Sequence, residues 1–102
     1  MLALKPNSRF QLEDDILLQA LPELDHYYVF KTKEGDNFKL NHTAHWVFEA
    51  IGKGMNYSKL LQGFSRKFKL DKKTAEKDLT EVIKYGLENK IIKEVKHEKG
   101  KN

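Results

Sequence analysis

The chain of 102 residues contains no cysteine, two prolines, one tryptophan and only two arginines, Arg9 and Arg66. Without cysteine it can form no disulfide, no thiol nucleophile and no cysteine-based zinc site, and the simplest compartment for it is the cytoplasm. It has no run of about 18 apolar residues, so no segment is expected to span a membrane. Its first residues lack the basic, apolar and small-residue order of a secretory signal.

Sequence signatures of catalysis are missing as well. There is no glycine-rich phosphate loop, no nucleophile elbow and no zincin motif. The acidic residues Glu13, Asp14 and Asp15 are consecutive, so their side chains cannot converge as a pair of catalytic carboxylates does. His42 and His45 are three apart, which suits a metal, but no third ligand is evident. We therefore expect no enzymatic activity, no catalytic residue, no metal site and no cofactor.

The composition indicates a globular chain, since 39% of the residues are hydrophobic and 33% are charged. At this length we expect one domain over residues 10–95, a flexible N-terminus over 1–9 and a flexible basic tail over 96–102. The net charge of +4 is compatible with nucleic acid, an acidic peptide or simple solubility.

The order of hydrophobic patterns predicts an α+β fold. Strands are expected at 16–20, 27–32 and 37–40, with a hairpin turn that contains Gly35 between the last two. Helices are expected at 43–51, after Asn56, and from the N-cap Asp71 to a left-handed end at Asn89. A short extended segment closes the domain at 91–95. This predicts a winged helix-turn-helix with a three-stranded N-terminal antiparallel sheet, followed by three helices and a short C-terminal extended segment.

The junction at residues 38–44 is the most informative feature. Phe38 and Leu40 alternate with Lys39, as in a strand with one buried face, and Asn41 is suited to cap the helix that follows. A strand at this position can form the edge of the sheet, where unpaired backbone groups are able to capture a peptide.

The chain from about residue 27 to residue 92 resembles the PqqD-like family, the RiPP recognition elements, which are peptide chaperones. The family's Leu-Asn-x-Thr-Ala junction is matched by Leu40, Asn41, Thr43 and Ala44. The apolar positions of the family's first two helices are matched by Val47, Phe48, Ile51, Tyr57, Leu60, Phe64 and Phe68. Its turn, third helix and closing segment are matched by Leu70, Asp71, Asp78, Leu79, Val82, Ile83, Ile91 and Ile92. The chain departs from the family at Lys90, where glycine is usual, and at Gly86, where leucine is usual.

The resemblance implies that the chain binds the leader region of a ribosomally synthesised precursor peptide by strand addition. The leader would lie between the edge strand and the third helix and be presented to a modifying enzyme, such as a radical SAM maturase, a leader peptidase or a cyclase. The peptide-binding residues implied are Asn37, Phe38, Lys39, Leu40, Lys73, Lys77, Thr80, Glu81 and Lys84. Lysines on the helix would suit an acidic leader.

Two alternatives remain. Winged helix-turn-helix proteins include DNA-binding transcriptional regulators. Residues 72–90, however, hold five lysines and four acids and no arginine, which is a poor composition for neutralising phosphates and for reading guanine. The chain could also be a piece of a larger modification enzyme, because recognition domains of this type also occur fused.

Overall fold

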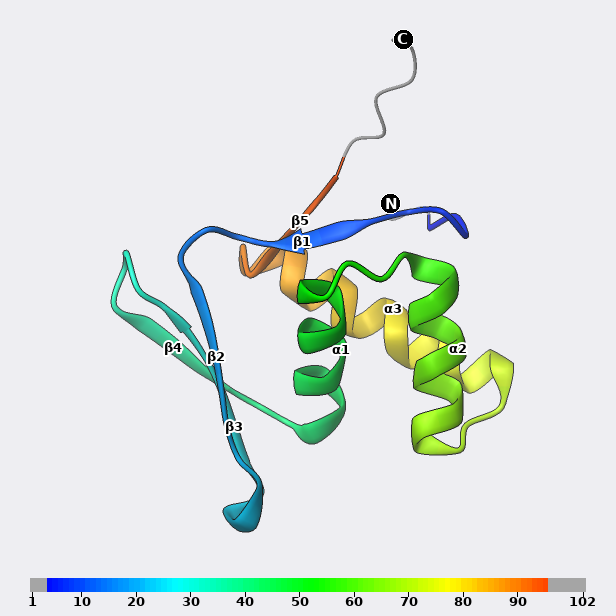
Figure 1. The fold of residues 1–102 in the computed structure, drawn as a ribbon, viewed down its shortest axis with the longest axis horizontal. Coiled ribbons are helices and arrows are strands. Elements are labelled where there is room, and N and C mark those ends of the chain that lie inside the picture. The colour runs from blue at the N-terminus through cyan, green and yellow to red at the C-terminus, as the bar shows by residue number, and fades with distance from the viewer. Residues whose placement is uncertain (1–3, 96–102) are drawn as a thin grey trace, which may run out of the picture.

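The computed structural model describes residues 4–95, and residues 1–3 together with the expected tail 96–102 lie outside the described part. The described elements are β1 Phe10–Leu12, β2 Ile16–Leu21, a 3-10 turn Pro22–Leu24, β3 His26–Lys31, β4 Asp36–Leu40, α1 His42–Gly52, α2 Tyr57–Phe68, α3 Lys72–Glu88 and β5 Ile92–Glu94. Figure 1 shows the three helices packed beside a three-stranded sheet. The expected α+β class is confirmed.

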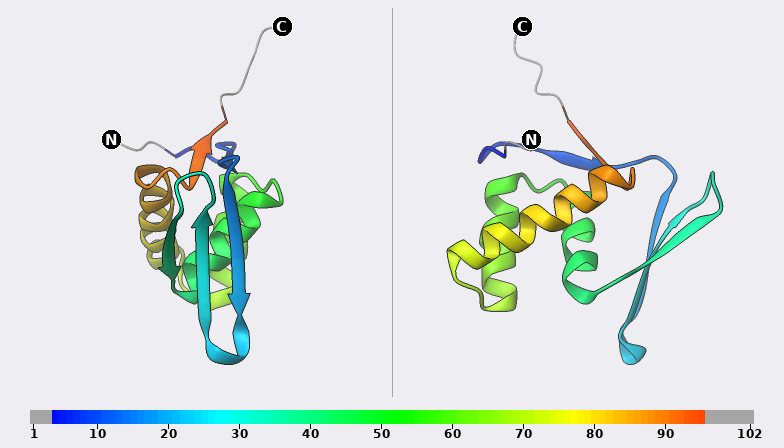
Figure 2. Two further views of the ribbon diagram at one scale, coloured as in Figure 1. Left: turned by 90° about the vertical axis from the view of Figure 1, so that its left-hand side faces the viewer. Right: turned by 180° about the vertical axis from the view of Figure 1, so that it is seen from behind.

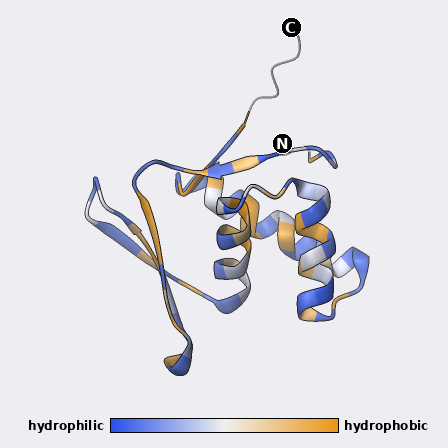
Figure 3. Ribbon diagram, in the orientation of Figure 1, coloured by the Kyte–Doolittle hydropathy of each residue, from blue (hydrophilic) through white to orange (hydrophobic). Residues whose placement is uncertain are grey.

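The three-stranded sheet is antiparallel and follows the order β2-β3-β4. Gly35 allows the hairpin between β3 and β4, because it adopts a φ of 75° that other residues rarely take. The strands alternate as predicted, and Tyr27, Val29 and Leu40 are buried on the face toward the helices. On the outer face β2 exposes Leu17 and Leu21, and Figure 3 shows that β2 is hydrophobic along most of its length.

A second, two-stranded sheet joins the two ends of the described chain. The strand β1 pairs with β5 in antiparallel register, with Leu12 opposite Ile92. The closing segment expected at 91–95 is therefore a strand, and its partner lies about eighty residues earlier in the sequence. Residues 4–9 contact α2, because the Ser8 and Pro6 carbonyls accept from the Tyr57 and Ser58 amides at 2.8 and 2.9 Å. The prediction of a flexible N-terminus stays a prediction.

The N-terminus of each helix is capped by the residue that its sequence suggests. Asn41, Asn56 and Asp71 accept through their side chains from the amides of Ala44, Lys59 and Thr74, at 2.8, 3.0 and 2.8 Å. Each cap satisfies one of the free amides of a first helical turn. The helix starts are thus determined by short-range chemistry that is visible in the sequence.

The end of α3 differs from expectation. Asn89 does not take the left-handed conformation, since its φ is −97°, and Lys90 takes it instead with a φ of 58°. The Lys90 amide donates to the Leu87 carbonyl at 3.2 Å and the Ile91 amide to the Gly86 carbonyl at 2.8 Å. These are the two bonds of a Schellman motif, which needs its left-handed residue at position 90 and turns Ile91 into the core.

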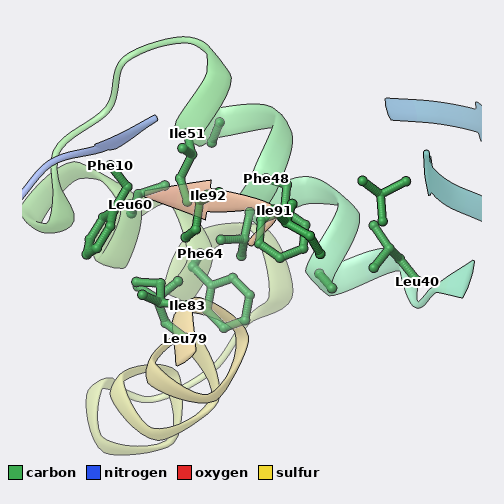
Figure 4. Packing of buried hydrophobic residues seen from close by; sticks show 14 of the residues in the cluster. Phe10, Leu40, Phe48, Ile51, Leu60, Phe64, Leu79, Ile83, Ile91 and Ile92 are labelled. Atoms are coloured by element: carbon green, nitrogen blue, oxygen red, sulfur yellow. The ribbon is translucent and has the colours of Figure 1, made fainter. Parts of the chain in front are cut away.

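The hydrophobic core lies between the helices and continues to the inner face of the sheet (Figure 4). Its largest fully buried side chains are Phe48, Phe64, Ile51, Leu60, Leu79, Ile83, Ile91, Ile92, Val29 and Val47. Gly86 is buried here without room for a larger residue, because a Cβ at this position would lie 2.7 Å from Cε1 of Phe48. The packing of Phe48 and Ile92 therefore leaves no room for a leucine at this position.

A buried lysine links the sheet to the helical part. Lys31 at the end of β3 is only 4% exposed, and its Nζ donates to the Lys90 carbonyl at 2.9 Å. A buried amine needs such a partner, because an unpaired one costs several kcal/mol. This bond connects β3 with the turn that ends α3, and so helps to set the position of the sheet against α3.

In residues 4–95 no helix is long and apolar enough to cross a membrane.

Candidate functional site

The strand β4 forms one edge of the three-stranded sheet. Its neighbour in the described chain is β3, with Val29 opposite Phe38 and Tyr27 opposite Leu40. On the other side of β4, every second amide and carbonyl has no ladder partner among the described residues. This confirms the expected edge strand, and Figure 2 (left) shows that β4 is the strand on the side of α3, with β2 on the far side.

The inner face of β4 packs on the helices. Leu40 is 5% exposed and belongs to the core, and Phe38 is partly buried against it. The ring of Phe38 meets that of Tyr85 on α3 edge to face, with centroids 6.4 Å apart. Asn37 and Lys39 are exposed and alternate with these residues. Strand geometry therefore directs the Lys39 side chain to the opposite face of the sheet.

A groove of about 470 Å³ runs between the end of β4, the start of α1 and α3. From β4 and α1 it is lined by Lys39, Leu40, Asn41, Thr43 and Ala44, and from α3 by Asp78, Glu81, Val82 and Tyr85. The α3 residues follow the spacing i, i+3, i+4, i+7, which describes one helix face. The groove is thus bounded by an open strand edge on one side and a continuous helix face on the other.

The start of α1 lines the groove where β4 ends. The Asn41 Oδ1 accepts from the Ala44 amide at 2.8 Å and from the Thr43 hydroxyl at 2.9 Å. Asn41 directly follows the last residue of β4, so the same cap that begins the helix also fixes where the strand edge ends. This is the Leu-Asn-x-Thr-Ala junction noted in the sequence, and it lies in the groove.

The structure brings together some of the residues predicted to bind a peptide and separates others. Lys39, Leu40 and Glu81 line the groove, and Phe38 and Asn37 lie on the same strand. Lys73, Lys77 and Lys84 are exposed but are not among the lining residues, and Thr80 packs toward Tyr57 of α2. At Tyr57, burial raises the pKa of the phenol and the hydrogen bond with Thr80 opposes this effect.

The lining residues that the sequence did not predict to bind a peptide are Asn41, Thr43, Ala44, Asp78, Val82 and Tyr85. The signal for those on α3 is its buried stripe, which consists of Ala75, Leu79, Ile83 and Gly86. At about 100° per residue, Asp78, Val82 and Tyr85 border this stripe, whereas Lys73, Lys77 and Lys84 lie on the far side of the helix. Which border of the stripe meets β4 depends on the tertiary structure.

The groove face of α3 is acidic. The ion pair found among the described residues joins Lys93 and Glu13 at 3.9 Å, so in residues 4–95 neither Asp78 nor Glu81 has a cation within ion-pairing distance. Neither carboxylate takes part in any of the described side-chain hydrogen bonds. The groove lining therefore carries two carboxylates on α3 without an ion-pair partner in residues 4–95, together with Lys39 on β4.

The two histidines at the start of α1 take part in aromatic packing. The His42 ring stacks on Tyr27 with centroids 5.2 Å apart, and His45 is 7% exposed with its centroid 5.0 Å from that of Tyr27. Burial lowers the pKa of the His45 imidazole, Glu49 opposes this effect, and His42 adds to it. No group of three or more metal-ligating side chains occurs in the part of the chain that the structure describes.

The fold is similar to that of two solved structures. One is described as TbiB1 in complex with the TbiA(beta) leader peptide, with a TM-score of 0.72 and 13% sequence identity over 81% of this chain and 94% of that one. The other is described as lasso peptide synthetase B1 complexed with the leader peptide, with a TM-score of 0.71 and 18% identity over 83% of this chain and 98% of that one. No protein-family model and no curated protein matches the sequence. At these identities, the likeness shows a shared fold.

Proposed function

We propose that this chain binds the leader region of a ribosomally synthesised precursor peptide and presents it to a modifying enzyme. The observation that carries the proposal is the groove of about 470 Å³ beside the open edge of β4. An extended peptide can pair with the free backbone groups of β4 and place alternate side chains into the groove. The two similar structures are both described as complexes with leader peptides, and the similarity covers 94% and 98% of their chains.

The binding mode follows from the two walls of the groove. Main-chain hydrogen bonds to residues 37–40 supply affinity with little demand on the peptide sequence. Side chains that face inward meet Leu40, Ala44, Val82 and Tyr85, which supply apolar contact. The roles of Lys73, Lys77, Thr80 and Lys84 in peptide binding stay predictions from the sequence. Single changes to alanine would test them.

The partner enzyme follows from the same proposal. A binding protein without a catalytic step of its own needs an enzyme that acts on the bound precursor, and the candidates are a radical SAM maturase, a leader peptidase and a cyclase. One similar structure is described as lasso peptide synthetase B1 complexed with the leader peptide, so a lasso-forming system is the first to test. A short precursor gene and a maturase gene beside this one would support the proposal.

The cytoplasmic location also stays a prediction.

A DNA-binding regulator is the second candidate. It is favoured by the exposed Lys73, Lys77 and Lys84 on α3, and a winged helix-turn-helix would use α3 as its recognition helix with the sheet as the wing. Against it, the same helix carries Asp78 and Glu81, which would repel phosphates. We therefore favour the peptide.

A proline scan of the edge strand tests the proposal. The probe is a fluorescein-labelled leader segment of the precursor encoded beside this gene, and the readout is fluorescence anisotropy. Proline removes an amide, and alternation means that either Phe38 or Lys39 directs its amide outward. We expect Phe38→Pro or Lys39→Pro to weaken binding strongly, whereas Lys39→Ala keeps the amide and should change the affinity little beyond a charge effect.

Matched proline changes at Leu18 and Gln19 on β2, the opposite edge of the sheet, serve as controls, and circular dichroism confirms that each variant is folded. Folded proline variants at both β4 positions that bind the leader as tightly as the parent would show that strand addition at this edge is wrong.

A further inference from the structure

Resting on the peptide-binding function proposed above, we propose that Asp78 and Glu81 make this groove select peptides that carry a lysine or arginine two residues from an apolar or aromatic side chain. The sequence alone suggested the opposite charge preference, since lysines on α3 would suit an acidic leader. The structure places two carboxylates, and none of those lysines, in the groove lining.

The charges that face the groove add up to a negative field. Asp78 and Glu81 each contribute a full charge, and Lys39 is the one cation among the lining residues. The Lys39 side chain leaves the outer face of the sheet, because Lys39 alternates with the buried Leu40. The N-terminus of α1 adds only about half a positive charge, which the Asn41 cap already engages in part. A cationic side chain would therefore be favoured beside α3.

The apolar and acidic parts of the groove are arranged along α3. Tyr85 meets Phe38 toward the C-terminal end of the helix, and Asp78 lies seven residues earlier, about 10 Å along the axis. Inward side chains of an added strand are about 6.6–7 Å apart. One inward side chain can thus contact Tyr85 and Val82 while the next one reaches Glu81 and Asp78. This geometry gives the spacing of two residues between the apolar and the basic side chain.

Neither carboxylate is within ion-pairing distance of a cation in residues 4–95, although Lys77 and Lys84 lie four residues before and three residues after Glu81 on the same helix. The described ion pair is that of Lys93 with Glu13, so within residues 4–95 a basic side chain from a peptide would not have to displace an existing cation. Asp78 is half-buried beside the groove while Glu81 is exposed at its rim. A cation between them would gain a partly desolvated partner and an exposed one.

The test is a selection from a random twelve-residue peptide display library, which requires no knowledge of the natural leader. The parent chain is compared with the double variant Asp78→Asn/Glu81→Gln. The control is Asp14→Asn/Glu23→Gln, which makes the same change in net charge at two exposed positions outside the groove. Enriched peptides are then synthesised with their basic residue or with glutamine, and their affinities are measured by anisotropy at low and high salt.

We expect the parent and the control to enrich peptides with lysine or arginine two residues from an apolar residue. The double variant should lose this enrichment, and replacing the basic residue by glutamine should weaken binding to the parent by about threefold to tenfold, less so at high salt. Enriched peptides without a basic bias, or the same bias in the double variant, would overturn the charge preference while leaving peptide binding intact. Failure of the proposed function looks different: no peptide is enriched at all, or enriched peptides bind the β4 proline variants as tightly as the parent.

Discussion

Phe38 on β4 and Tyr85 on α3 meet edge to face, with ring centroids 6.4 Å apart and planes at 83°. The two residues are 47 positions apart in the sequence and connect the open sheet edge to the helix that faces it. Tyr85 is still 37% exposed, so part of its surface is free for a ligand. This pair marks the apolar end of the groove.

Changing Tyr85 to alanine should weaken peptide binding by about tenfold, or about 1.4 kcal/mol, because a partly exposed aromatic residue at the wall of a groove is a typical anchor. Stability should fall by only about 0.5–1.5 kcal/mol through loss of the pair with Phe38. Anisotropy and urea denaturation measure the two effects. Glu88→Ala, three residues on and outside the lining, is the control, and equal affinities for both variants would contradict the anchor role.

Changing Asn41 to alanine should destabilise the protein by about 0.5–2 kcal/mol, since the Ala44 amide loses its partner. It should also weaken peptide binding, because the cap fixes the end of the strand edge. The matched control is Asn56→Ala, which removes the equivalent cap from α2. Urea denaturation should show similar losses for both, and only Asn41→Ala should affect the peptide. An unchanged urea denaturation curve for Asn41→Ala would show that this cap does not contribute to stability.

Changing Gly86 to alanine should destabilise the protein, although alanine is the better helix former by about 1 kcal/mol. The new Cβ would lie 2.7 Å from Phe48 and 3.0 Å from Ile92, both fully buried, and overpacking of this kind costs about 1–3 kcal/mol. Gly63→Ala provides the comparison, because its Cβ would meet the half-buried ring of Trp46 at 3.0 Å, which has room to shift. Thermal denaturation should rank Gly86→Ala as the less stable, and adding Phe48→Leu should recover part of the loss.

Stability should decrease as the pH falls below about 6.5, the ordinary pKa of histidine. Burial lowers the pKa of His45 in the folded chain, so between the two pKa values the unfolded chain binds a proton that the folded one does not. The contribution of His45 is therefore complete above the unfolded pKa and is lost as the pH falls through the folded one. Urea denaturation at pH 7.5 and 5.5 measures this loss, and it should be smaller in His45→Gln. An identical loss in the variant would assign the effect to other groups.

Duplex DNA should bind only weakly and without sequence preference, with a Kd of about 10⁻⁴–10⁻⁶ M at physiological salt. The reason is the near balance of lysines and acids on α3, with Asp78 and Glu81 among the acids. Anisotropy with labelled duplexes, together with selection from a random duplex pool, measures it. A nanomolar affinity for one sequence would favour the regulator over the peptide-binding protein.

The features that the sequence by itself determined are those governed by short-range chemistry. The three N-caps Asn41, Asn56 and Asp71, the turn at Gly35 and the alternation of Phe38 and Leu40 depend on hydrogen bonds and periodicities within a few residues. These features were enough to predict the α+β class, the order of the three-stranded sheet and the three helices, and a strand that leads directly into a helix.

Long-range packing decided the rest. The pairing of β1 with β5, and the left-handed Lys90 that turns Ile91 into the core, depend on contacts between distant segments. The same holds for the groove. The buried stripe of α3 has two borders, and its amphipathic pattern does not say which one meets β4. The sheet's position, which the bond from Lys31 to the Lys90 carbonyl helps to hold, places the border with Asp78, Val82 and Tyr85 beside the edge strand. Lys73, Lys77 and Lys84 stay outside the groove lining.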